Sequence, residues 1–247
     1  MSGTTVYVGG RFDSIGGQPR NNIAALDATT GSATAWNPNA NGYGNIYVNS
    51  LAVSGTTVYV GGLFDSIGGQ LRSSMAALDA TTGTALAWNP NPSGGCGYCG
   101  VSILAVSGAT VYAGGNFGYI GGQPRKYVAA LDATTGTASA WNANLSGNSK
   151  FSVVSTLAVS GTTVYFSGHF GSMGGEPRYN FVALDATTGT ASAWNPNADN
   201  LVNTLVVSGK TVYAGGWFTR FGGVSRPYFA SWVEPISFRY NVPMVQR

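Results

Sequence analysis

The sequence predicts an all-β protein built as a five-bladed β-propeller with four antiparallel strands per blade. One unit returns five times, because the tyrosine of a Thr-Val-Tyr triplet falls at Tyr7, Tyr59, Tyr112, Tyr165 and Tyr213, in steps of 52, 53, 53 and 48 residues. An arginine recurs with the same period at Arg20, Arg72, Arg125, Arg178 and Arg226. A fixed period of this length is typical of repeat proteins whose units bury their faces against their neighbours.

Four short segments of each unit are predicted to be strands. In the second unit they are residues 50–55, 56–62, 75–80 and 85–90. Each is rich in Val, Tyr, Ala or Leu, is bounded by Gly, Asn, Asp or Pro, and lacks a helical period. Such sheets cannot bury both faces alone, and stacking them radially gives a propeller. A solenoid is the alternative, but parallel β-helix coils are usually shorter, and a leucine-rich repeat would show its own asparagine pattern.

The four connections differ in chemistry. Ser54-Gly55 fits a tight hairpin between the first two strands, and Asp27 to Gly31 fits a bulged turn between the last two. The other two connections are long, variable and rich in Gly or Asn. In an up-and-down blade, the short turns lie on one side of the disc and the variable connections on the other.

We expect one domain over residues 1–247, with repeats at approximately 1–49, 50–102, 103–155, 156–203 and 204–247. The ends are irregular, since Ser2 and Gly3 stand where the other copies have a full first strand. Pairing of terminal strands would close the ring and remove open edges. We expect residues 237–242 either to form the outer strand of the last blade or to replace the missing strand of the first.

The stretch Ala24–Trp36, AALDATTGSATAW, resembles the blade motif of quinoprotein-type propellers, and VYVGG with a later aspartate turn and tryptophan is similar to kelch repeats. The resemblance implies propeller architecture and no particular activity. Trp36 lies one position later than in the quinoprotein pattern, which would turn it to the other face of its strand unless a bulge intervenes. A quinone-dependent dehydrogenase is disfavoured, because no cluster of acids to hold the cofactor is evident.

Charge and composition exclude several classes. Only 9% of residues are charged and the net charge is +3, too weak for a nucleic-acid surface. No apolar run reaches the roughly 20 residues needed to cross a bilayer, so we expect no membrane insertion. Loops rich in Ser, Thr, Asn and Gly favour a secreted or cell-surface protein. No signal peptide precedes Ser2, so an exported protein would be present here in mature or trimmed form.

No enzyme chemistry is predicted. Cys96 and Cys99 favour a local disulfide, with free thiols the next reading, because His169 lies two repeats away and a zinc site needs more ligands. One histidine permits no Ser/His/Asp set, and Asp13, Asp65, Glu176 and Glu234 show no paired spacing. We expect no catalytic residues, no metal and no cofactor.

Several recurring residues are predicted to be structural. Aromatic side chains recur at Trp36, Trp88, Trp141 and Trp194 and at Phe12, Phe64, Phe117, Phe170 and Phe218, and they favour blade packing over a sugar platform. The five periodic arginines should pair with backbone carbonyls or with Asp27, Asp79, Asp132 or Asp185, rather than form an anion-binding ring. The glycine pairs should form turns or bulges, since no helix follows them.

The variable connections supply the candidate ligand-binding residues, because binding sites usually sit in loops on a rigid scaffold. They are Arg11, Asn116, Tyr119, His169, Trp217 and Arg220 on one set of connections, and Tyr43, Tyr47, Tyr98 and Phe151 on the other. Aromatic and amide groups with little charge suit neutral polar ligands such as carbohydrate. The sequence therefore predicts a non-catalytic extracellular binding or adhesion module, lectin-like for neutral glycans. The alternative is a protein-interaction scaffold without a small ligand. The oligomeric state is not predicted.

Overall fold

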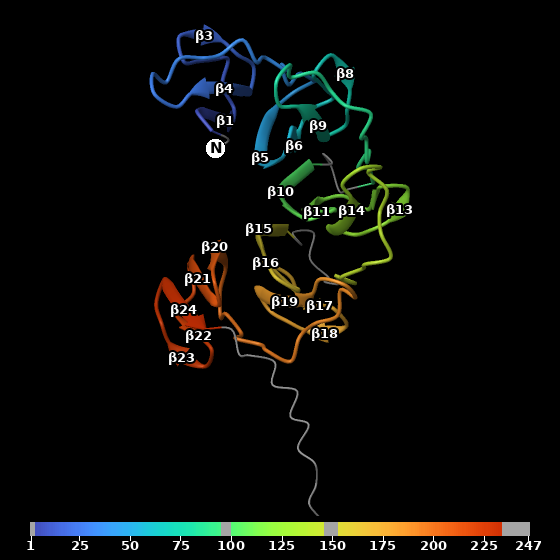
Figure 1. Cartoon of the computed structure of the whole chain (residues 1–247). Coiled ribbons are helices and arrows are strands. Elements are labelled where there is room, and N and C mark those ends of the chain that lie inside the picture. The colour runs from blue at the N-terminus through green and yellow to red at the C-terminus, as the bar shows by residue number, and fades with distance from the viewer. Residues whose placement is uncertain (1–2, 95–99, 146–152, 234–247) are drawn as a thin grey trace, which may run out of the picture.

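The computed structural model describes residues 3–94, 100–145 and 153–233, and every regular element there is a β-strand. The strands form five consecutive units that follow one another along an open arc (Figure 1). The all-β antiparallel prediction is confirmed, and the fold is that of a β-propeller. The described chain supplies five units, whereas closure into a ring of five blades stays a prediction.

The five units share one order of elements. Unit one holds β1 (Thr5–Gly9), β2 (Ser14–Ile15), β3 (Gln18–Pro19) and β4 (Ile23–Asp27). Unit two holds β5 (Tyr47–Ser54), β6 (Thr57–Leu63), β7 (Ser66–Ile67), β8 (Gln70–Leu71) and β9 (Met75–Asp79). Unit three holds β10 (Gly100–Ser107), β11 (Thr110–Asn116), β12 (Tyr119–Ile120), β13 (Gln123–Pro124) and β14 (Val128–Asp132). Unit four holds β15 (Val153–Ser160), β16 (Thr163–His169), β17 (Ser172–Met173), β18 (Glu176–Pro177) and β19 (Phe181–Asp185). Unit five holds β20 (Val202–Ser208), β21 (Thr211–Gly216), β22 (Arg220–Phe221), β23 (Val224–Ser225) and β24 (Phe229–Val233).

The main sheet of each later unit is a three-stranded antiparallel sheet, with β5-β6-β9 as the pattern, and unit one has only β1 and β4. The first three predicted strands are therefore confirmed. Ser54 pairs with Thr57, which leaves a two-residue turn with Gly55 at φ 56°, as a tight hairpin requires. The aspartate turn is also as predicted, since the Asp27 carboxylate accepts from the backbone N–H groups of Thr29 and Thr30 at 2.9 and 2.8 Å.

The connection between the second and third strands differs from the variable loop that the sequence predicts. In each unit it contains a two-stranded hairpin, such as β7–β8, so its backbone is regular. The predicted turn is confirmed for the second glycine pair, because Gly68 and Gly69 have φ of 60° and 79°, whereas Gly61 and Gly62 lie within β6. Two successive positive φ values define the type I′ turn that best joins twisted strands.

The predicted fourth strand is wrong as a regular strand. Each such segment makes a single bridge, for example Ala85 with Leu78, and then leaves the sheet. Three features explain this. Pro38 has no N–H to donate to a ladder, Asn39 takes a left-handed φ of 51°, and the Pro38 carbonyl accepts from Gly68 N in the next unit at 2.7 Å. The segment therefore crosses from one unit to the next.

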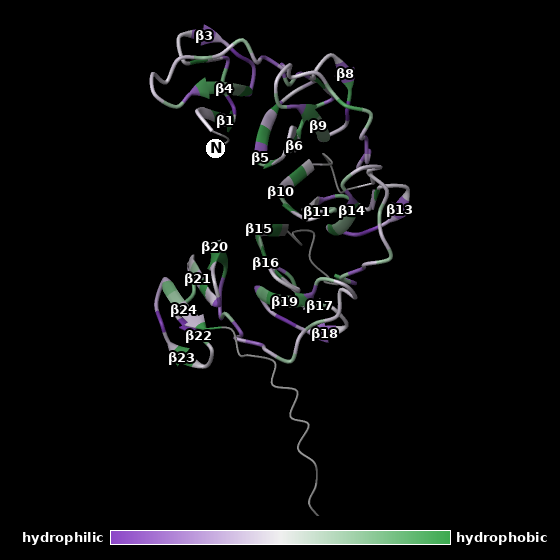
Figure 2. Ribbon diagram, viewed as in Figure 1, coloured by the Kyte–Doolittle hydropathy of each residue, from purple (hydrophilic) through white to green (hydrophobic). Residues whose placement is uncertain are grey.

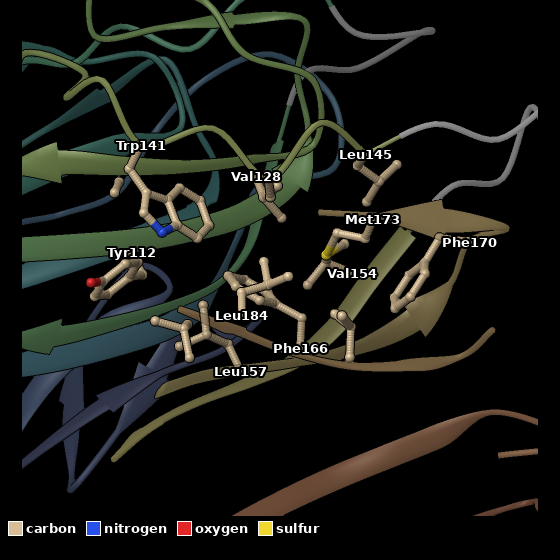
Figure 3. Close-up of a cluster of buried hydrophobic side chains, with 14 residues drawn as sticks. Tyr112, Val128, Trp141, Leu145, Val154, Leu157, Phe166, Phe170, Met173 and Leu184 are labelled. Carbon is tan, nitrogen blue, oxygen red and sulfur yellow. The ribbon is translucent and has the colours of Figure 1, made fainter. Parts of the chain in front are cut away.

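The hydrophobic cores lie between units. One core combines Tyr112, Val128 and Trp141 of unit three with Phe166 and Leu184 of unit four (Figure 3). Three similar cores join the other neighbouring pairs. Apolar colour accordingly runs along the strands of the main sheets (Figure 2). Because alternate residues point to opposite faces, each of units two to four has a leading face, packed on the unit before it, and a trailing face, packed on the unit after it.

Two hydrogen bonds reinforce each of the first three seams. The Tyr59 hydroxyl donates to the Ala133 carbonyl at 2.8 Å, and Trp88 Nε1 donates to the Asp132 carbonyl at 2.9 Å. Burial, helped by the charge of Asp132, raises the pKa of Tyr59, which keeps the hydroxyl protonated as a donor. Tyr7 with Trp36 and Tyr112 with Trp141 repeat the pattern. The tryptophans are thus packing residues, and they dock on the following unit.

The periodic arginines bind backbone carbonyls, which is one of their two predicted partners. Arg72 donates to the carbonyls of Leu71 at 2.8 Å and Leu86 at 2.7 Å, and so ties the hairpin to the crossing segment of its own unit. Arg20, Arg125 and Arg178 make the same pair of bonds. The aspartates cap their own turns instead of pairing with these arginines. Residues 237–242, predicted to close the ring, lie outside the described residues.

Candidate interaction face

The hairpins and crossing segments meet at every seam and form what we call the loop face. Asn41 N donates to the Ser66 carbonyl at 2.9 Å, and Ser93 N donates to the Tyr119 carbonyl at 2.8 Å. In each case the crossing segment of one unit bonds the hairpin of the next. The prediction that the long connections gather together is therefore supported by direct contacts.

Carboxylates anchor two of these seams. Asp199 accepts from the Thr219 hydroxyl at 2.7 Å and from the backbone N–H groups of Thr219 and Arg220 at 2.8 and 2.9 Å. The hydroxyl bond, followed by the backbone bonds, holds the pKa of Asp199 below its usual value. Asp65 likewise accepts from the backbone N–H of Tyr43 at 2.9 Å. These acids fix loop positions, and their hydrogen-bonding capacity is largely used by the protein itself.

Three clefts open along the seams. The first, of about 480 Å³, holds Arg11 with Asp13, Asn21, Asn22, Gly44 and Ile46. The second, of about 600 Å³, lies where Asn37–Asn39 and Asn41 meet β7, β8 and the turn at residues 82–84. The third, of about 500 Å³, lies between units four and five and is lined by Tyr179, Asn180, residues 195–199, Arg220 and Gly223. Asparagine side chains contribute to all three linings.

The structure places the predicted ligand residues at several separate points. Arg11 and Arg220 line different clefts, while Asn116 and His169 end the second strands of units three and four opposite Gly100 and Val153. Exposed members of the set are Arg11, Tyr43, Tyr119, His169, Trp217 and Arg220, and the half-buried ones are Tyr47 and Asn116. They do not converge on one pocket. Tyr98 and Phe151, like Cys96 and Cys99, lie outside the described residues.

The sequence reading missed the amide-rich lining. Asn195 belongs to the segment predicted as a fourth strand, Asn197 and Asp199 follow that segment, and Tyr179 follows the periodic Arg178. A signal was present, because asparagine recurs two residues apart after each of the four periodic tryptophans, as at Asn37 and Asn39. Left-handed backbone at Asn39, Asn91, Asn144 and Asn197 explains why asparagine stands there.

Within residues 3–94, 100–145 and 153–233, no group of three or more His, Cys, Asp or Glu side chains is placed to hold a metal. The part of the chain that the structure describes also contains no helix long and apolar enough to cross a membrane. Four of the five periodic arginines are engaged by carbonyls of their own units, which favours the structural role over an anion-binding ring.

Repeated three-stranded sheets, inter-unit cores and loop-face seams define a β-propeller repeat protein. Residues 1–217 match the family model of outer membrane protein assembly factor BamB, and the chain therefore belongs to this family. A comparison with curated proteins returned no match.

Two solved structures with TM-scores above 0.5 agree on the fold. The computationally designed Ika8 protein aligns with a TM-score of 0.57 and 16% identity over 94% of this chain and 56% of its own. A chain of the mitotic checkpoint complex aligns with a TM-score of 0.53 and 17% identity over 80% of this chain and 53% of its own. BamB from Moraxella catarrhalis aligns with a TM-score of 0.46 and 20% identity over 94% of this chain and 62% of its own. The chain thus spans just over half the length of Ika8 and a little less than two thirds of the length of BamB from Moraxella catarrhalis.

Proposed function

We propose that this chain is a non-catalytic β-propeller scaffold that binds protein partners through its loop face. The observation that carries this is a series of exposed apolar side chains on the connections between second and third strands of four units. They are Leu71, Tyr119, Tyr179, Trp217 and Tyr228. Their backbones are held by hairpins and seam bonds, so the surface is ordered before any partner arrives.

The chemistry of this surface suits proteins. Aromatic side chains are enriched at protein interfaces and often carry most of the binding energy. Charge is sparse, with 9% charged residues in the chain, which favours partners with apolar or neutral polar segments. Membership of a family described as an outer membrane assembly factor supports the same proposal, and extends it to a location on the outer-membrane side of a bacterial envelope.

A displayed library of random peptides, selected on the purified full chain, tests the proposal. Enriched peptides should bind the unmodified chain and lose at least about tenfold in affinity, about 1.4 kcal/mol, with Trp217→Ala or Tyr119→Ala. Thr56→Ala and Thr162→Ala, at exposed positions in the first hairpin turns that line none of the three clefts, serve as matched controls and should leave affinity unchanged. Failure to enrich any peptide, or peptides equally sensitive to the control changes, would contradict the proposal.

A neutral glycan is the second candidate ligand, and the cleft between units four and five favours it. Tyr179 offers an aromatic face, Asn180 offers an amide, and Asn195 Oδ1 is buried with no hydrogen-bond partner. Buried polar atoms usually find partners, so Asn195 is suited to receive a sugar hydroxyl. In this form the protein would be a lectin-like adhesion module, secreted or on the cell surface.

A glycan array run at moderate salt tests this second candidate. A coherent hit on one neutral sugar, weakened by Tyr179→Ala and Asn195→Ala but unchanged by Tyr43→Ala, would support it. Tyr43 is a suitable control because it is exposed and lies at a different seam. A blank array from folded protein would eliminate the glycan candidate and leave the protein-binding proposal standing.

A further inference from the structure

The cleft at the seam of units one and two, which we call the amide cleft, has the size of a binding site. Its volume is about 600 Å³, and binding clefts usually measure roughly 300 to 1,000 Å³. One wall is the crossing segment of unit one. The other is the hairpin of β7 and β8 together with the turn at residues 82–84.

Hydrogen bonds across the seam hold the two walls of the amide cleft together. Asn41 N donates to the Ser66 carbonyl at 2.9 Å, and Ser66 N donates to the Asn41 carbonyl at 3.0 Å. Gly68 N donates to the Pro38 carbonyl at 2.7 Å. A site whose backbone is already ordered loses less conformational entropy when a ligand binds.

Three amide side chains on these walls have unused hydrogen-bonding capacity. Asn37, Asn39 and Gln70 are exposed, and their side chains make no hydrogen bond within the part of the chain that the structure describes. The hydroxyls of Thr82 and Thr84, by contrast, bond each other at 2.8 Å. Each side-chain amide offers one acceptor and two donors, whereas a peptide group offers one donor and one acceptor. The two kinds of group can therefore pair through two hydrogen bonds.

The described residues that line the amide cleft include no charged side chain and no aromatic one. A charged group brought into the cleft would lose part of its hydration and would gain no opposite charge in return. A sugar ring is usually held against an aromatic face, which this lining does not offer. The lining therefore favours an uncharged polypeptide segment over a charged one and over a glycan.

Leu71 departs from the repeat at this cleft. Proline holds the equivalent position in three other units, at Pro19, Pro124 and Pro177. Leu71 lines the amide cleft and is 81% exposed. It offers an apolar contact beside the hydrogen bonds of the amides, a combination that is usual at protein interfaces.

The same hollow recurs between units four and five with a different charge. Residues 195–197 line that cleft in the places of residues 37–39, and Arg220 stands where the amide cleft has Ser66. The hollow is thus a feature of the seam, and of these two clefts the amide cleft is the uncharged one.

We propose that the amide cleft binds an uncharged, extended segment of a protein partner. The peptide groups of the segment pair with Asn37, Asn39 and Gln70, and one of its apolar side chains packs on Leu71. An extended segment is required because the peptide groups of a helix already bond one another. The inference rests on the proposed function, since it assigns a class of peptide to one part of the loop face.

Peptides selected on the full chain from a displayed library of random sequence test the inference. We expect a class of enriched peptides that contains no Asp, Glu, Lys or Arg and has at least one large apolar residue. Calorimetry should show their affinity falling at least about tenfold with the double variant Asn37→Ala, Asn39→Gly and with Leu71→Pro. Both changes preserve the fold, because glycine keeps the left-handed φ of 51° at position 39, and proline is the residue of three other units at position 71.

Gln18→Ala is the matched control for Gln70→Ala. The two glutamines hold the same exposed hairpin position, but Gln18 lines none of the three clefts. Gln70→Ala should weaken binding of the selected peptides, and Gln18→Ala should not. In NMR spectra, the side-chain amide resonances of Asn37, Asn39 and Gln70 should move when a selected peptide is added, while that of Gln18 should stay in place.

Three results would overturn the inference. The first is a set of enriched peptides that all carry charged residues or that keep their affinity in the cleft variants. If those peptides still depend on Trp217 or Tyr119, the proposed function stands without the inference. The second is a library that yields no peptide, which contradicts both. The third is a neutral oligosaccharide that moves the amide resonances of the cleft when no peptide does, which assigns the cleft to a glycan.

Discussion

At the residue scale, the aspartates of the short turns show how one side chain fixes a local conformation. Asp79 accepts from the backbone N–H groups of Thr81 and Thr82 at 2.9 and 2.7 Å and from the Thr82 hydroxyl at 2.9 Å. These bonds, that of the Thr82 N–H first, lower the pKa of Asp79 from 3.8. Asp27, Asp132 and Asp185 sit in the same arrangement and are shifted in the same direction.

This geometry predicts an acid-sensitive contribution to stability. A carboxyl whose pKa is lower in the folded state than in the unfolded state stabilises the fold at pH values above its unfolded-state pKa. That contribution is lost as the pH falls through its folded-state pKa. The melting temperature should therefore drop below about pH 4, and it should drop less in the double variant Asp79→Asn, Asp132→Asn, whose amides do not titrate. Thermal melts from pH 5 to pH 2 measure the difference. Parallel curves for the two proteins would contradict the assignment.

Burial distinguishes tryptophans of the same chain. Trp88 is buried at a seam and donates to Asp132, whereas Trp217 is 70% exposed on the loop face. Trp88→Ala should lower the free energy of unfolding by about 3 to 5 kcal/mol as a core truncation. Trp217→Ala should stay within about 0.5 kcal/mol, as is usual for exposed positions. Urea unfolding of both variants checks this, and the reverse order would refute the packing account.

Much of this residue-level detail could be predicted from the sequence. Periodicity identified Trp88 as structural and gave Arg72 backbone carbonyls as one of two partners. The docking partner of Trp88 could not be predicted, because it is a backbone carbonyl of the next unit, and no side-chain pattern in the sequence reports it.

At the element scale, the main finding is that a unit has no core of its own. Its sheet is apolar on both faces, and each face is buried by a different neighbour. The sequence predicts the first three strands of each unit well, because hairpin turns and apolar runs are local signals. It fails for the fourth segment. The residues around Ala33 and Trp36 have the composition of a strand, but the Pro38 carbonyl accepts a hydrogen bond from the next unit. Such competition between units is a tertiary effect.

Removal of one hydroxyl group tests whether hydrogen bonds between units stabilise the fold. Tyr59→Phe removes the hydroxyl that donates to the Ala133 carbonyl of the next unit, and leaves the ring in place. We expect a loss of about 1 kcal/mol, a typical net value for such a bond. Tyr119→Phe is the matched control, because its hydroxyl donates to Gly122 within its own exposed hairpin. Denaturant unfolding should separate the two variants, and an equal effect would argue against stabilisation across the seam.

At the scale of the whole molecule, five units share four cores, so the end units are each supported from one side. Repeat proteins of this kind gain stability from interfaces between nearest neighbours. The sequence predicts the repeat and the propeller class. It does not predict the loop-face clefts, because they arise from segments of two units and have no signature within one.

Amide hydrogen exchange of the purified chain tests the shared cores most directly. Protection reports the free energy of local opening. We predict slowest exchange in β6, β11 and β16, which lie in units with a neighbour on both sides, and faster exchange in β1 and β21. Equal protection of all five strands, or slower exchange at the ends, would contradict the claim that the units are stabilised by the cores between them.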